Sequence, residues 1–114
     1  MANLKDILEK SGFPATRVVW KVKKGQEKPI TYYTFQRITK TPAVSADDSV
    51  KEEVEVYLIR IITKNDFEAL LHETVANLRK AGIGVTSVDQ EMFEESTGYW
   101  IVPLIIQVMG GIFS

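Results

Sequence analysis

The 114-residue chain has no cysteine and only one histidine, His72. Without cysteine it can form no disulfide, no thiolate nucleophile and no cysteine-ligated zinc site. A lone histidine leaves no second imidazole for a histidine-based metal site, and its place beside Leu70 and Leu71 indicates a surface or boundary position on a helix. These absences disfavour thiol chemistry and most metal-dependent chemistry.

Long apolar runs are missing as well. The longest, Trp100–Val108, is interrupted by Pro103 and Gln107 and is far shorter than the roughly 20 residues of a membrane helix. The opening residues Met1–Asp6 lack the apolar core of a secretory signal. We therefore expect a complete cytosolic chain that does not associate with membranes.

The net charge of −1 gives no general attraction to nucleic acid, but the charges are segregated along the chain. From Arg17 to Lys40 there are seven basic residues and one acid, whereas Asp47–Glu55 holds five acids and Asp89–Glu95 four. Two interpretations stay open. The runs are solvated faces with local pairing, or they are complementary surfaces between neighbouring subunits.

Two helices are predicted. Asn3 is a suitable cap for a short helix over Leu4–Lys10, which Gly12 ends. Thr63 and Asp66 resemble a capping box before a long helix that ends at Gly82. Its apolar stripe follows helical spacing and consists of Phe67, Leu70, Leu71, Thr74, Val75 and Leu78.

Strand composition recurs in five segments: Thr16–Val22, Ile30–Lys40, Lys51–Ile62, Gly84–Val88 and Tyr99–Val108. The second and third are expected to form a hairpin around a loop at Thr41–Val50. Pro103 cannot donate a ladder hydrogen bond, so the last strand should lie at a sheet edge there or bulge. Gly110–Ser114 is expected to be a mobile tail.

This order predicts one domain over residues 1–114 with an α+β fold. We expect a single antiparallel or mixed β-sheet, with one long helix and a short N-terminal helix packed on it. The hydrophobic fraction of 45% is enough to form a core without a metal or disulfide.

No motif carries recognisable chemistry. The adjacent carboxylates Asp47–Asp48 and Glu94–Glu95 sit in polar segments, where such pairs are normally hydrated. Gly82-Ile83-Gly84 follows a helix and lacks the context of a dinucleotide site. The aromatic run around Tyr32 fits a sheet better than a base-stacking platform. We therefore predict no catalytic residue, no cofactor and no metal site.

The chain resembles the small tail-component proteins of siphophages and Gram-positive prophages, in the tail-terminator or tail-completion group. The resemblance is carried by four segments that together span nearly the whole chain: Leu4–Leu8 with Gly12-Phe13-Pro14, Pro29–Tyr33, Val54–Ile62 running into Thr63–Asp66 and the helix, and the acidic segment followed by Tyr99 and an apolar strand. Residues 110–114 and the basic turn Lys21–Lys28 have no match in that pattern.

The resemblance implies a non-enzymatic morphogenesis subunit. Such proteins form rings, commonly hexameric, that cap the tail tube and join it to the head connector. The implied partners are copies of the chain, the tail tube protein and head–tail connector proteins, in the host cytoplasm during assembly and then in the virion tail. As a hypothesis, subunit contacts are assigned to the two acidic segments through Asp47, Asp48, Glu91, Glu94 and Glu95.

Other functions stay open at this point. A different head–tail connector or head-completion subunit would have the same general features. A small α+β adaptor or ligand-binding domain would work as a monomer or dimer, and a stable monomer with a defined apolar pocket would distinguish it. A small enzyme is disfavoured by the lack of any motif.

Overall fold

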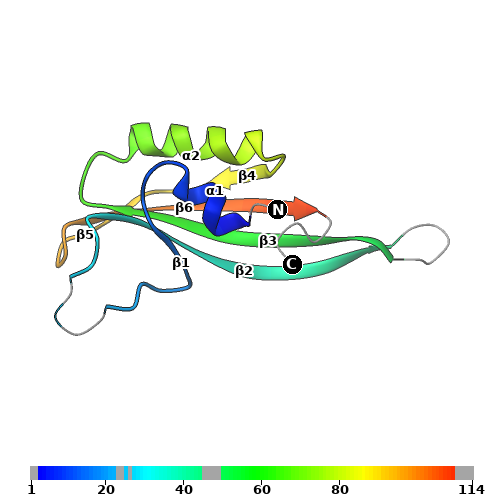
Figure 1. The fold of residues 1–114 in the computed structure, drawn as a ribbon, viewed down its shortest axis with the longest axis horizontal. Coiled ribbons are helices and arrows are strands. Elements are labelled where there is room, and N and C mark those ends of the chain that lie inside the picture. The colour runs from blue at the N-terminus through cyan, green and yellow to red at the C-terminus, as the bar shows by residue number, and fades with distance from the viewer. Residues whose placement is uncertain (1–2, 23–24, 26, 45–49, 110–114) are drawn as a thin grey trace.

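The computed structural model describes residues 3–22, 25, 27–44 and 50–109. Its helices and strands follow one another as α1 (Leu4–Glu9), β1 (Ala15–Arg17), β2 (Thr31–Val44), β3 (Val50–Thr63), α2 (Glu68–Lys80), β4 (Gly84–Val88), β5 (Met92–Glu94) and β6 (Tyr99–Met109). The expected α+β class is confirmed for this part of the chain (Figure 1).

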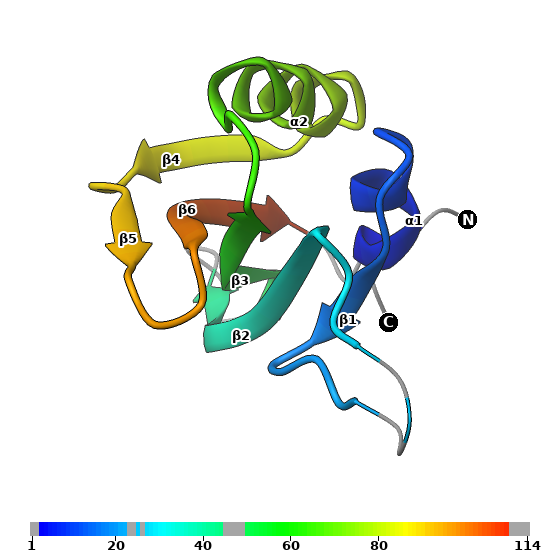
Figure 2. The same cartoon turned by 90° about the vertical axis from the view of Figure 1, so that its left-hand side faces the viewer.

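The strands form one six-stranded mixed sheet in the order β1-β2-β3-β6-β4, with β5 also paired to β6. β1 and β2 are parallel, and the other pairs are antiparallel. Both helices lie on the same face of this sheet, α2 beside β4 and α1 beside β1 (Figure 2). The architecture is a single sheet covered on one side.

The core lies between the helices and the sheet. Alternate residues of the three central strands point toward the helices, as the two-residue period of a strand requires. Tyr33, Ile59, Ile61, Leu104 and Ile106 are fully buried there. They meet α1 and α2 in one continuous cluster, so the sheet and both helices form one cooperative unit.

The N-terminal helix is confirmed, but the expected long helix is not. α2 has 13 residues, close to the average of about 11–12 for globular proteins. It begins after Thr63, because Thr63 ends β3 and its hydroxyl faces that of Thr31 at 2.8 Å. The predicted capping box is therefore wrong. Asp66 accepts a hydrogen bond from the backbone N–H of Glu68 instead.

The predicted strand Thr16–Val22 is also wrong, since β1 ends at Arg17. Val18 has a φ of 68°, and the N–H of Val19 donates to the carbonyl of Arg17 at 2.8 Å, which closes a three-residue turn. A positive φ is unfavourable for a β-branched residue. The turn directs the following valines away from the sheet, where strand composition alone predicted pairing.

The hairpin is confirmed, but its strands are longer than predicted. β2 continues to Val44 and β3 starts at Val50, so much of the expected loop Thr41–Val50 belongs to the ladder. Residues 45–49, which include Asp47 and Asp48, lie outside the described residues, as does the expected tail Gly110–Ser114. The paired strands project beyond the helices as an arm (Figure 1), and the molecule measures 54 × 30 × 24 Å.

Pro103 does not mark an outer edge, because β6 is hydrogen-bonded to β3 on one side and to β4 and β5 on the other. The N–H and C=O groups of one residue point to the same side of an antiparallel strand. The carbonyl of Pro103 accepts from Asp89 N–H at 2.9 Å, between the end of β4 and the start of β5. The side of Pro103 that lacks an N–H therefore faces the gap between β4 and β5. Proline is tolerated there because neither β4 nor β5 is paired to β6 at that point.

Replacing Thr34 with valine is expected to raise the free energy of unfolding by about 1 kcal/mol. Thr34 is buried, and its Oγ1 has no hydrogen-bond partner in the described part of the chain, so the methyl group removes a desolvation cost. Chemical denaturation measures the change. The matched control is Thr31→Val, which breaks the hydroxyl pair with Thr63 and should destabilise. Equal effects of the two substitutions would contradict this account.

Candidate functional site

Histidine and carboxylate side chains are the first candidates for chemistry in the described residues. His72 is exposed on α2. No group of three or more histidine, aspartate or glutamate side chains that could hold a metal ion occurs in the part of the chain that the structure describes. A cavity of about 280 Å³ beside Thr63 and Leu70 is lined by two carboxylates, Asp66 and Glu73, and has no histidine or lysine among its described lining residues. The features that distinguish the molecule are on its surface.

The first such surface, which we call the acidic edge, surrounds β5. Three apolar side chains, Val88, Met92 and Phe93, are about half exposed there. Four exposed acids surround them, namely Asp89, Glu91, Glu94 and Glu95. Exposed apolar side chains among charges are candidates for a partner-binding surface.

The acidic edge is rigidly supported. The Phe93 ring packs on Trp100 with 4.9 Å between centroids, and Trp100 packs on Phe67 before α2 at 5.5 Å. Glu94 accepts from the Thr97 hydroxyl at 2.6 Å, and its carbonyl accepts from Gly98 N–H at 2.8 Å. The turn between β5 and β6 is thereby fixed, so binding a partner here would cost little ordering entropy.

The second surface, which we call the cationic flank, follows β1. It combines exposed apolar side chains with exposed cations and consists of Arg17, Val18, Val19, Lys21, Val22, Lys28 and Ile30. Trp20 anchors it by packing on Tyr32 with 5.5 Å between ring centroids. Tyr32 in turn contacts Tyr99, whose hydroxyl donates to the Pro29 carbonyl at 2.7 Å. Trp20 thus attaches the part of the flank that follows β1 to the sheet face opposite the helices, whereas Arg17 lies over Phe35 on the helix side.

The strands β1 and β5, which carry these two surfaces, lie toward opposite edges of the sheet. β1 is one edge of the strand order, whereas β5 pairs with β6 near the other edge. In Figure 2 β5 lies at the far left and the segment after β1 at the lower right. One copy therefore presents an acidic apolar surface on one side and a cationic apolar surface on the other.

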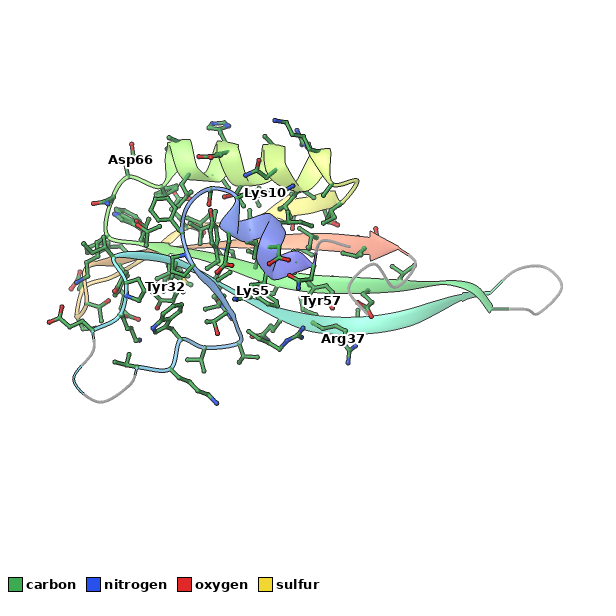
Figure 3. All side chains as sticks on the ribbon, in the orientation of Figure 1. Lys5, Lys10, Tyr32, Arg37, Tyr57 and Asp66 are labelled. Atoms are coloured by element: carbon green, nitrogen blue, oxygen red, sulfur yellow. The ribbon has the colours of Figure 1, made fainter. Side chains whose placement is uncertain are left out.

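A pocket of about 380 Å³ lies beside the cationic flank, between α1 and β1. It is lined by Asn3, Leu4, Lys5, Thr16, Arg17, Phe35 and Tyr57. The Arg17 guanidinium lies over the Phe35 ring, 5.2 Å from its centroid. Figure 3 shows Lys5 and Tyr57 near one another at this end of α1. The pocket thus has an aromatic wall and two cationic side chains.

Tyr57, which forms part of the aromatic wall of the pocket, belongs to a buried polar cluster. Its hydroxyl donates to Glu55 Oε2 at 2.9 Å, and Glu55 Oε1 lies 3.7 Å from Arg37 Nη1. Burial raises the pKa of Tyr57, and the bond to the Glu55 carboxylate raises it further. Glu55 is therefore engaged by Tyr57 and Arg37, and its charge is compensated locally.

Of the predicted interface residues, Glu91, Glu94 and Glu95 are brought together on the acidic edge and are exposed. Asp47 and Asp48 lie outside the described residues. Sequence reasoning missed the apolar half of the surface. The sequence does carry a signal for these apolar residues, because Met92 and Phe93 interrupt the acidic run. The presence of Lys5 and Arg17 in one pocket had no local sequence signal, because it depends on how α1 packs.

None of the helices in the described ranges combines the length and apolar character needed to cross a bilayer. No protein-family model matches the chain, and a search of curated proteins found no similar sequence.

Proposed function

We propose that the protein is a non-enzymatic structural subunit that assembles with copies of itself into a closed ring. The observation that carries this proposal is the pair of complementary surfaces, the acidic edge and the cationic flank, toward opposite edges of one sheet. A surface that fits a different surface of the same molecule produces a head-to-tail contact. Repeated head-to-tail contacts close into a ring when the rotation between copies allows it.

The composition of both surfaces supports this assembly. Each places exposed valine, methionine, phenylalanine or isoleucine side chains among charges mostly of one sign, with Glu27 as the exposed acid in the described part of the cationic segment. Apolar burial supplies the free energy of association, and opposite charges fix the partner and speed the encounter. Two copies placed side by side in the same orientation bring the acidic edge of one against the cationic flank of the other. A contact between two acidic edges, or between two cationic flanks, would be repulsive.

The open edge of the β2–β3 arm also supports a role in assembly. β1 pairs with β2 over Tyr33–Phe35, and the outer edge of β2 from Arg37 onward has no partner strand within the described residues. Unpaired edges of long strands offer backbone hydrogen bonds to another chain. The arm is thus available to a neighbouring copy or to a different partner in the particle.

The specific ring we propose is that of a tail-terminator, or tail-completion, protein, which caps the tail tube of a phage and joins it to the head. The resemblance of segments such as Leu4–Leu8 and Pro29–Tyr33 motivates this choice. Another head–tail connector subunit would form a similar ring. Adding the purified protein to polymerising tail tube protein separates the two, because a terminator binds tube ends and limits their length.

The mass in solution tests self-assembly. With light scattering across a concentration series, we expect a shift from the 12.9 kDa monomer to a closed species of about six copies, visible as rings by negative-stain imaging. Added salt should move the transition to higher concentration, because screening weakens contacts between exposed charges. A strict monomer at every concentration would contradict self-assembly and favour a small adaptor or ligand-binding domain.

A further inference from the structure

The pocket between α1 and β1 is lined by two exposed cationic residues, Lys5 and Arg17. Arg17 is exposed, makes no salt bridge in the described part of the chain, and places its guanidinium carbon over the Phe35 ring, 5.2 Å from the centroid. Lys5 is paired with Glu9 at 3.7 Å, but both side chains are substantially exposed. Exposed ion pairs at this helical spacing stabilise a helix only weakly. Both cations are therefore available to an incoming anion.

The pocket has apolar walls as well as cationic side chains, so it selects a ligand with an apolar part beside its negative charge. Phe35 and Tyr57 are buried and form an aromatic wall, and Leu4 adds an aliphatic surface. The contact with the Phe35 ring restricts the Arg17 side chain, which reduces the entropy lost when the guanidinium pairs with a carboxylate. The chemistry that fits is a carboxylate on a chain that also carries apolar or aromatic side chains.

This chemistry occurs on the acidic edge of the molecule itself. Glu91 and Glu95 flank the exposed Met92 and Phe93, and the turn after β5 holds the segment in place. The edge and the pocket cannot meet within one copy, because β5 and β1 lie toward opposite edges of the sheet. A second copy placed beside the first brings its acidic edge to the pocket.

We propose that the pocket at Lys5 and Arg17 is the receptor for the acidic edge of the next copy, residues Glu91–Glu95, in the assembled ring. This inference rests on the proposed ring and assigns its contact. The two cations bind the carboxylates, and the exposed valines of the cationic flank cover the apolar side chains of β5. Each copy uses its pocket toward one neighbour and its acidic edge toward the other.

Charge reversal on each side, followed by the combination, tests this contact. Lys5→Glu with Arg17→Glu should raise the dissociation constant of the ring at least about tenfold, and Glu91→Lys with Glu95→Lys should do the same. Combining all four changes should restore assembly, because the charges are then exchanged. Light scattering measures the protein concentration at the midpoint of assembly, and thermal unfolding of each variant checks that the monomer still folds.

The matched control reverses charges that lie elsewhere. Glu73→Lys and Arg79→Glu on exposed positions of α2 should leave the midpoint unchanged. If the wild-type ring forms and reversal at the pocket does not weaken it, or if the four-fold combination does not recover assembly, the assigned contact is overturned while the ring itself stands. A wild-type chain that stays monomeric overturns the ring and the contact together.

Discussion

Replacing Tyr33 with alanine is expected to lower the free energy of unfolding by about 3–5 kcal/mol, because the side chain is fully buried between the sheet and both helices. Its hydroxyl lies 2.6 Å from Ser11 Oγ and 2.8 Å from Thr74 Oγ1. Tyr33 thus connects the end of α1, strand β2 and the middle of α2. Its loss should weaken the attachment of both helices, which denaturant titration by circular dichroism will measure.

Tyr33→Phe isolates the part due to the hydroxyl. It should cost about 1–3 kcal/mol, because it leaves the buried Thr74 hydroxyl without its partner. Ser11 is less affected, since its hydroxyl also donates to the Leu8 carbonyl at 3.0 Å. Adding Thr74→Val to Tyr33→Phe should therefore recover part of the loss. A double variant less stable than the Tyr33→Phe protein would contradict the role given to this hydroxyl chain.

Alkaline pH should destabilise the protein steeply. All four tyrosines of the sequence are buried in the fold, and burial is the largest cause that raises the pKa of each above the ordinary value of 10.0. The unfolded chain releases these protons near pH 10, while the folded chain retains them. The stabilisation is therefore constant below about pH 10 and is lost as pH rises toward the folded values, by about 1.4 kcal/mol per pH unit for each tyrosine.

The measurement is the melting temperature as a function of pH, with tyrosinate absorbance followed in the folded state. Tyr57→Phe is the informative variant, because the carboxylate of Glu55 adds to burial at that residue. This substitution should make the decline of the melting temperature above pH 10 shallower. A melting temperature that does not change between about pH 9 and 11, or tyrosines that titrate in the folded protein near their ordinary value, would contradict the proposed cause.

The sequence predicted those parts of the fold that depend on local periodicity. Alternating apolar residues identified the central strands, and Asn3 and Gly12 marked the ends of the short helix, with Asn3 Oδ1 accepting from Asp6 N–H at 2.9 Å. The errors arose where tertiary contacts override a local signal. Thr63 resembles a helix cap, but its hydroxyl is used by Thr31 across the β2–β3 pair.

The same limit applies to the site. Segregated charge was visible in the sequence, and Glu91, Glu94 and Glu95 are indeed exposed together. The position of this segment opposite β1 was not predictable, because it follows from the strand order of the sheet. The pocket was hidden for the same reason. Lys5 and Arg17 lie on separate elements that meet only after α1 packs against β1.

The central position of β6 has a consequence for the timing of folding. It is the last described strand along the chain, yet it is hydrogen-bonded to β3, β4 and β5. During synthesis on the ribosome, β3 is therefore exposed along one edge until Tyr99–Met109 has emerged, while the β2–β3 hairpin can already form. A long unpaired edge of this kind is prone to pair with other nascent chains. Slow translation between β3 and β6 should therefore increase aggregation, and a chain truncated before Tyr99 should not form this sheet.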